Sequence, residues 1–265
     1  MALGGERILV KQRNKWLVGA AALACAAVTW AQPPAGRGGR GGRGGPPPTP
    51  KAAAPIDITG YWVSVVTEDW RYRMVTAPKG KFGGVPLNPE GRRVANAWDP
   101  AKDEAAGQQC RAYGAAALMR EPGRFHIAWQ DDRTLRVDAD TGKQTRLFHF
   151  GAQPPPEIEP SWQGYSVAEW EPAVAGRGPS KGGDLKVVTT HLLAGYLRKN
   201  GIPYSANAVV TEYYDLIHAP NGDQWLVVST EVNDPQYLTM PFITSTHFKK
   251  LPDASGWDPE PCSAQ

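Results

Sequence analysis

Residues 209–232 read VVTEYYDLIHAPNGDQWLVVSTEV, and this stretch decides the fold class. Two runs rich in Val, Tyr, Thr and Trp, residues 209–218 and 224–232, lie on either side of Asn221-Gly222. Such composition is typical of β-strands, and Asn-Gly between two strand-like runs is the strongest short-range signal for a β-hairpin. The sequence therefore predicts an antiparallel hairpin here.

A two-residue loop at Asn221 and Gly222 sets the expected register of this hairpin. The expected pairs are His218 with Trp225, Leu216 with Val227, Tyr214 with Ser229 and Glu212 with Glu231. Because side chains alternate between the two faces of a strand, these pairs share one surface. Two facing carboxylates repel unless a cation, a shared proton or a basic side chain lies between them. The register predicts a pocket at Glu212 and Glu231, with a solvated outer face as the alternative.

Further strand-like segments follow one another at short spacing. They are residues 61–67, 124–130, 134–138, 143–150, 164–171 and 185–192, then the hairpin and a last segment that ends near Lys250. Short links without βαβ alternation predict a mainly β fold, an antiparallel meander of about 8–9 strands. We expect it to close into a barrel, with a sandwich as the alternative. Asn88 followed by Pro89 predicts a small helical insertion over about residues 88–111.

The first 55 residues differ in composition from the rest. Residues 1–31 combine basic residues, a 13-residue apolar run and a small residue at Ala31, which indicates a secretory signal peptide. We expect cleavage near Ala31, with lipid attachment at Cys25 as the alternative. Residues 32–55 hold three Arg-Gly-Gly repeats and a proline run, and predict a disordered tether. Residues 56–265 are then a single domain of a periplasmic or secreted protein.

The charge of the chain is unevenly distributed. The net charge is +3, but residues 1–51 hold eight basic and one acidic residue, which leaves 21 basic and 25 acidic residues in the domain. A domain with a net charge of about −4 does not suggest a nucleic-acid surface. No apolar run approaches the ~20 residues of a membrane span. The sequence thus favours a small-molecule ligand over nucleic acid or membrane as the partner.

Two cysteines follow the predicted signal peptide, Cys110 and Cys262. In an oxidising compartment an isolated pair is expected to form a disulfide, with two free thiols as the alternative. The bond would tie the C-terminal tail to the helical insertion.

Several polar and aromatic side chains are candidates for a site. Glu212 or Glu231 is the candidate general base and His191 or His247 its partner, since adjacent carboxylates push their pKa values apart. The candidate ligand-binding residues are Tyr196, Arg198, Tyr214, Trp225, His218 and Trp162. Arg198 lies in a loop that is expected to cap the barrel mouth and hold an anionic group, with a plain surface loop as the alternative.

Known cofactor motifs are absent from the sequence. It has no phosphate-cradling loop, dinucleotide fingerprint, Gly-x-Ser-x-Gly or Cys-x-x-Cys, which disfavours an NTPase, a Rossmann oxidoreductase, a serine hydrolase and a thioredoxin-like protein. No cofactor is expected. The five histidines show no compact metal-binding spacing, so no metal is expected. The favoured hypothesis is a barrel that binds a small, partly apolar ligand in an aromatic-lined cavity. The alternatives are a lyase, isomerase or hydrolase on the same barrel, and an envelope interaction module.

Two resemblances accompany these patterns. Residues 159–171 (EPSWQGYSVAEWE) and 189–214 (TTHLLAGYLRKNGIPYSANAVVTEYY) resemble a recurring pattern in a family of uncharacterised exported bacterial proteins. This resemblance implies export and one β domain, and no activity. Gly60-Tyr61-Trp62 resembles the opening of lipocalin-type barrels, in which the tryptophan plugs the barrel floor. This second resemblance implies a lipocalin-like barrel architecture.

Overall fold

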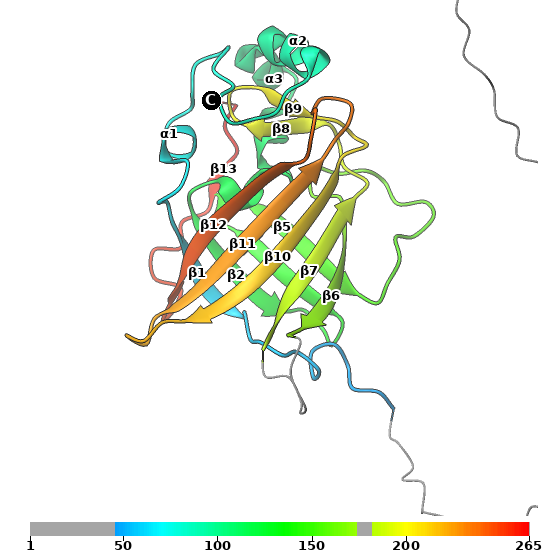
Figure 1. Ribbon diagram of the computed structural model, residues 1–265, viewed down its shortest axis with the longest axis vertical. Coiled ribbons are helices and arrows are strands. Elements are labelled where there is room, and N and C mark those ends of the chain that lie inside the picture. Colours follow the sequence, from blue (N-terminus) through cyan, green and yellow to red (C-terminus); the bar gives the residue numbers. More distant parts are fainter. Residues whose placement is uncertain (1–45, 174–181, 265) are drawn as a thin grey trace, which may run out of the picture. The chain divides into compact units, whose positions relative to one another are not determined.

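Nine strands form a closed barrel in this computed structural model, which describes residues 46–173 and 182–264 (Figure 1). The strands are β1 (Gly60–Val65), β2 (Arg124–Trp129), β3 (Thr134–Ala139), β5 (Gln144–Phe150), β6 (Tyr165–Pro172), β7 (Gly183–Thr190), β10 (Val209–His218), β11 (Gln224–Asn233) and β12 (Phe242–Leu251). Their order is β1-β12-β11-β10-β7-β6-β5-β3-β2, and β2 pairs with β1 to close the barrel. The expected mainly β barrel is confirmed. The predicted signal peptide lies outside the described residues.

One strand pair departs from the expected antiparallel meander. β5 and β6 run parallel, with Phe148 opposite Ser166, whereas the other neighbouring strands of the barrel are antiparallel. Parallel neighbours need a long crossover connection. Residues 151–164 (GAQPPPEIEPSWQG) supply it, because they form a proline-rich link that is too long for a hairpin turn.

The register of the β10–β11 hairpin differs by one residue from the prediction. His218 pairs with Gln224, and Glu212 faces Thr230 while Glu231 faces Thr211. The loop is longer than two residues because the backbone N–H of Ala219 donates to the carbonyl of Asp223 at 2.8 Å. A slip of one residue moves every side chain to the other face of the sheet. The expected Glu212–Glu231 pair is therefore wrong: Glu212 points inward, and Glu231 lies on the outer face.

Side chains fill the centre of the barrel. Five large aromatic residues are buried there: Trp62, Phe125, Phe148, Tyr214 and Phe248, each at most 1% exposed. Two pairs of these rings make edge-to-face contacts, Phe125 with Phe248 at 5.2 Å and Phe148 with Tyr214 at 5.6 Å between centroids, which add to the stability from apolar burial. The indole N–H of Trp62 donates to the carbonyl of Ile58 at 2.9 Å, so burial leaves this donor satisfied.

Helices and a short hairpin cover the upper end of the barrel, as Figure 1 shows it. They are α1 (Trp70–Arg73), α2 (Pro89–Ala97), α3 (Pro100–Ala105), the short 3-10 helices η1 (Gln109–Tyr113) and η2 (Leu118–Arg120), and strands β8 (Gly195–Arg198) and β9 (Ile202–Tyr204). The side chain of Asn88 caps α2 by accepting the backbone N–H of Gly91 at 2.8 Å, with Pro89 at the first helical position. The predicted helical insertion is confirmed.

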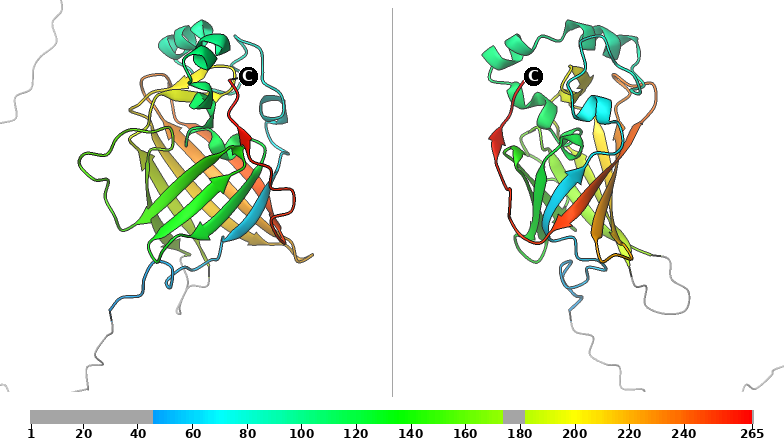
Figure 2. Two further views of the ribbon diagram at one scale, coloured as in Figure 1. Left: turned by 180° about the vertical axis from the view of Figure 1, so that it is seen from behind. Right: turned by 90° about the vertical axis from the view of Figure 1, so that its left-hand side faces the viewer.

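The C-terminal segment runs along the outside of the barrel toward these helices (Figure 2). A disulfide joins Cys110 to Cys262, as the sequence predicted. Strand β13 (Glu260–Pro261) pairs in parallel with β4 (Thr141–Gly142), and Trp257 packs edge-on against Tyr61 at 5.9 Å. The tail is thus held by backbone pairing as well as by the covalent bond.

Candidate functional site

A buried ion pair crosses the barrel interior. Arg146 donates to both carboxylate oxygens of Glu212, at 2.6 and 2.9 Å, and both side chains are fully buried. Arg146 also donates to Thr189 at 3.2 Å, and Thr189 shares a hydrogen bond with Ser166. Burial lowers the pKa of Arg146, but Glu212 and the other partners outweigh it, so the net shift is upward. Glu212 is neutralised by a cation and sealed from solvent, so its position is that of a structural group.

The other three candidate acid–base groups lie elsewhere. Glu231 is on the outer face of β11. His247 is on the outer face of β12, opposite Val227 of β11. Val227 precedes Glu231 by four residues, so His247 and Glu231 are about 13 Å apart along the strands at ~3.3 Å per residue. His191 is exposed, follows the end of β7 and has a left-handed backbone with φ of 57°. These four side chains do not share a cavity.

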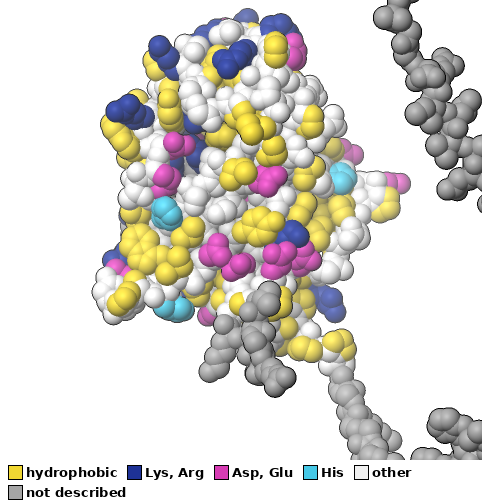
Figure 3. Space-filling model, in the orientation of Figure 1, with side chains coloured by type: hydrophobic (Ala, Val, Ile, Leu, Met, Phe, Trp, Pro, Cys, Tyr) yellow, Lys and Arg dark blue, Asp and Glu magenta, His cyan; other side chains and the backbone are white. Residues whose placement is uncertain are grey.

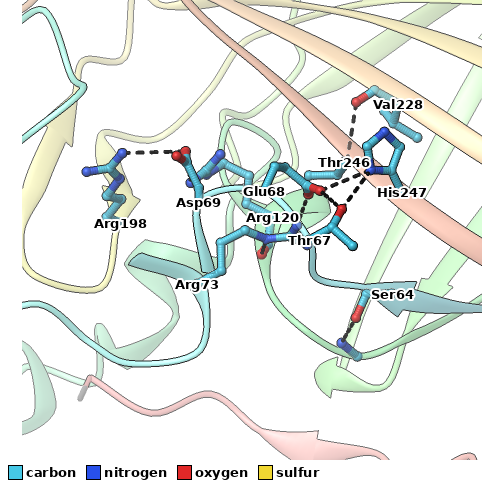
Figure 4. A network of polar contacts seen from close by, with 11 residues as sticks. Ser64, Thr67, Glu68, Asp69, Arg73, Arg120, Arg198, Val228, Thr246 and His247 are labelled. Carbon is cyan, nitrogen blue, oxygen red and sulfur yellow. Dashed lines mark hydrogen bonds and ion pairs between the residues drawn. The ribbon is translucent and has the colours of Figure 1, made fainter. Parts of the chain in front are cut away.

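His247 has a carboxylate partner that the sequence did not suggest. Its Nδ1 lies 3.0 Å from Glu68 and 3.4 Å from the hydroxyl of Thr67 (Figure 4). The imidazole is about one-third exposed, on the outside of the barrel. A histidine–carboxylate contact on a partly exposed outer wall can orient the imidazole ring.

The six candidate ligand-binding residues also fall into separate places. Tyr214 is in the barrel interior, where burial and the nearby Glu212 raise its pKa. Tyr196 and Arg198 are buried beneath the helices, where Tyr196 donates to Asp103 at 2.7 Å. The remaining three lie outside the barrel interior: Trp225 on the outer face of β11, His218 at the exposed end of β10, and Trp162 in the link before β6. The six residues therefore do not line one site, and the pocket that was expected at the hairpin depended on a register that differs by one residue from the observed one.

An aromatic-lined cavity opens at the lower end of the barrel. Its volume is about 560 Å³, within the range of ligand pockets. Trp129, Leu135 and Trp170 form the barrel side of this cavity, and the segment from Ala54 to Thr59 forms the other side. The two tryptophan rings are tilted by 54° with their centroids 6.4 Å apart, and Phe150 packs behind both. We call this space the lower cavity.

Charged groups of both signs lie at the rim of the lower cavity. Lys51 and Asp57 line it beside the apolar side chains. Burial acts to raise the pKa of Asp57, but hydrogen bonds from the hydroxyl and backbone of Thr59, together with Lys250, outweigh it and lower the pKa. Asp57 is therefore held as a carboxylate near an apolar wall.

The N-terminal segment is fixed to the barrel at this cavity. The indole N–H of Trp170 donates to the carbonyl of Pro50 at 2.9 Å, and the backbone N–H of Lys51 donates to Asp132 at 3.2 Å. Residues 50–55 were expected to belong to the tether, but those at positions 50, 51, 54 and 55 contact or line the barrel end. An alternating pattern shows which strand residues face inward, but it gives no sign of a preceding segment that folds back over them.

Acidic side chains gather on the outer wall above this end, over the lower part of β7 and β10 (Figure 3). Lys186 bridges Glu169 and Glu171 at 2.9 and 3.1 Å. Asp215 lies beside Asp184, and burial together with this second acid raises the pKa of Asp215 to about 6. Within the described segments, no three or more His, Cys, Asp and Glu side chains are grouped so that they could hold a metal ion.

The alternation of residues could have identified part of this arrangement. Arg146 occupies the same face of β5 as Phe148 and Phe150, so the sequence QTRLFHF (residues 144–150) indicates that this arginine points inward. A buried arginine needs an anionic partner, which could have been predicted as well. Trp129 and Trp170 lie near strand ends, where an aromatic side chain lines an opening. The proximity of these two tryptophans depends on the order of the strands in the barrel, which cannot be predicted from the alternation of residues.

Comparison of the chain with protein-family models, curated proteins and solved structures finds no match. In the part of the chain that the structure describes, no helix has the length and apolar character to cross a membrane. The residues and their contacts therefore carry the functional inference.

Proposed function

We propose that this protein is an exported barrel that binds a small, partly apolar ligand in the lower cavity. The observation that carries the proposal is the wall formed by Trp129, Leu135 and Trp170. Aromatic and aliphatic surfaces bind apolar ligands by removing both from water, and a few polar groups fix the orientation. Lys51 and Asp57 would supply these polar contacts at the rim. A periplasmic or secreted location accords with the disulfide, since such bonds persist in oxidising compartments.

The enzyme hypothesis has less support. Glu212 is paired with Arg146, and the other candidate acid–base groups are on the outer surface or an exposed turn. A general base must lie within hydrogen-bonding reach of a bound substrate. A binding role needs only the apolar wall and the rim, both of which belong to one cavity.

Titration with N-phenyl-1-naphthylamine, an uncharged aromatic probe that fluoresces in apolar surroundings, tests the proposal. We expect saturable binding of one probe per chain, with quenching of tryptophan fluorescence. Trp170→Ala should weaken binding at least tenfold, because it removes one wall of the cavity. Ala54→Trp should block binding by filling the cavity from its rim without removing a core side chain.

Trp225→Ala is the matched control, because it removes the same ring from the outer face of the barrel. It should leave probe affinity within twofold. Equal loss of affinity in Trp170→Ala and Trp225→Ala, or full affinity in Ala54→Trp, would place the probe elsewhere and refute the proposal.

A further inference from the structure

A loop with both apolar and basic residues lies at the upper end of the barrel. Residues 70–83 read WRYRMVTAPKGKFG and comprise α1 and the link that follows it. The loop contains four basic residues, and the next acidic residue along the chain is Glu90. Figure 1 shows α1 on the side of the molecule, toward the end of the barrel opposite the lower cavity. We call this segment the 70–83 loop.

The inner side of the 70–83 loop is anchored to the rest of the protein (Figure 4). The side chain of Arg73 is 1% exposed and donates to the carbonyl of Arg120 at 2.8 Å. The guanidinium of Arg198 lies 4.1 Å from the centroid of the Tyr72 ring and donates to the carbonyl of Gly83 at 2.7 Å. Arg198 therefore joins the two ends of the loop, and these contacts fix which of its side chains face outward.

The outer side of the 70–83 loop exposes apolar side chains. Trp70, Met74 and Val75 are 55%, 58% and 64% exposed. Seven large apolar side chains are exposed in the described segments, and these three lie within six positions of one another. Single exposed apolar side chains are ordinary, whereas a group of them at one place marks an interaction surface.

Uncompensated positive charge accompanies these apolar side chains. Arg71, Lys79 and Lys81 are exposed, and none of them belongs to an ion pair among the described residues. The guanidinium of Arg71 lies 5.4 Å from the centroid of the Trp70 ring. Lys79 donates to the carbonyl of Trp98 at 2.6 Å, a neutral acceptor that leaves its charge in place. Figure 3 shows further Lys and Arg side chains over the same upper end.

We propose that the 70–83 loop is a docking surface for an anionic phospholipid membrane. Tryptophan beside Lys and Arg is typical of segments that lie in the membrane interface, where apolar side chains enter the acyl region and cations face the lipid phosphates. Lys is depleted at protein–protein interfaces, so this composition fits a lipid surface better than a folded protein. The contact is peripheral, and it does not depend on ligand binding in the lower cavity.

Co-sedimentation with lipid vesicles tests the proposal. The protein is the chain without residues 1–31, the predicted signal peptide, so every variant carries the same tether. We expect binding to vesicles of phosphatidylglycerol and phosphatidylcholine in equal parts, weakened by high salt, and little binding to phosphatidylcholine alone. Brominated acyl chains should quench tryptophan fluorescence, and Trp70→Phe should bind with less quenching. No binding to the anionic vesicles, or equal binding to both kinds, overturns the proposal.

Two apolar residues of the 70–83 loop test insertion into the bilayer. The double variant Met74→Ser with Val75→Ser should weaken vesicle binding by about tenfold, because less apolar surface leaves water. The matched control is Leu193→Ser with Ile217→Ser, since these side chains are also exposed, at 42% and 49%, and lie outside the loop. The control should bind within twofold of the unsubstituted protein. Equal loss in the two variants overturns the proposal.

Two basic residues test the contact with lipid phosphates. Arg71→Gln with Lys81→Gln should weaken binding by about 30-fold, since each basic residue near an anionic surface contributes about 1 kcal/mol. Arg133→Gln with Lys143→Gln makes the same change in net charge at exposed positions outside the loop, and should have a much smaller effect. Equal weakening in both variants would assign binding to total charge and overturn the proposal.

The two loop variants together distinguish a membrane from other acidic partners. A soluble polyanion needs the cations of the loop but not its exposed apolar side chains. Loss of binding on neutralising the charges, with no loss on removing the apolar side chains, would therefore indicate a polyanion site and refute membrane docking. Unchanged binding in both loop variants would assign the interaction to the tether and refute it as well.

Discussion

Replacing Glu212 by glutamine breaks the ion pair inside the barrel and leaves Arg146 as an unpaired buried charge. Both oxygens of Glu212 accept from Arg146 at 2.6 and 2.9 Å, and neither side chain is exposed to solvent. Removing one partner of such a pair costs about 3–5 kcal/mol in the free energy of unfolding. For a domain of this size each kcal/mol lowers the Tm by about 2–4 °C, so Glu212→Gln should lower the Tm by about 6–20 °C.

Urea denaturation followed by tryptophan fluorescence measures this free energy, and the Tm checks it. Glu231→Gln makes the same substitution in the same hairpin on the outer face, and should change stability by less than about 0.5 kcal/mol. The double variant Arg146→Met with Glu212→Leu removes both charges and should be close to the unsubstituted protein in stability. The reasoning is refuted if Glu212→Gln lowers the free energy of unfolding by less than about 1 kcal/mol. It is also refuted if the double variant loses as much free energy of unfolding as Arg146→Met alone and Glu212→Leu alone added together.

Two further predictions concern the tail and the outer wall. Cys262→Ser removes the disulfide and should cost about 2–4 kcal/mol, and peptide mapping without reduction should find one linkage between the cysteines. The pKa of Asp215 is raised to about 6 in the folded protein, so its protonated form stabilises the fold. This contribution to stability is fully present below about pH 4 and is lost as the pH rises through 6. Asp215→Asn should therefore gain Tm over the unsubstituted protein at pH 7.5 and show little difference at pH 4; equal Tm differences at both pH values would contradict the repulsion from Asp184.

The sequence predicted the hairpin but not its register. Asn221-Gly222 marks the turn correctly, because Gly222 has a φ of 87° that favours glycine. The backbone N–H of Ala219 donates to the carbonyl of Asp223, so the loop is residues 220–222 and includes Pro220, which has no N–H to donate to the ladder. Within this loop the side chain of Asn221 accepts the backbone N–H of Asp223 at 3.1 Å. The extra loop residue shifts the pairing by one residue. The chemistry expected for the hairpin changed with it, because Glu212 and Glu231 then face opposite sides of the sheet.

Strand positions were easier to predict than the neighbours of each strand. Alternation identifies inward side chains such as Phe148 within one strand, but it does not say which strand pairs with which. The parallel β5–β6 pair depends on which strands become neighbours in the barrel. The proximity of Arg73, Arg120 and Arg198 depends on how distant segments of the chain pack together. Both candidate binding sites lie at barrel ends, where links and helices meet the strands, and this is where sequence patterns carry the least information.

The position of the lower cavity also changes how the envelope hypothesis can be tested. The envelope hypothesis predicts that deleting residues 32–51 abolishes association with the envelope, but this deletion also removes Pro50, which accepts from Trp170, and Lys51, which lines the cavity. A loss of association would then have two causes, the missing tether and an altered cavity.

A protein that lacks residues 32–45 keeps Pro50, Lys51 and Ala54, so its probe affinity should be unchanged whatever the tether does. A protein that begins at residue 56 should bind the probe more weakly, since it lacks Lys51, Ala54 and Pro55 from one side of the cavity and the anchor of Pro50 on Trp170. If both shortened proteins bind equally well, the segment before residue 56 contributes nothing to binding, and the barrel wall together with residues 56–59 forms the site.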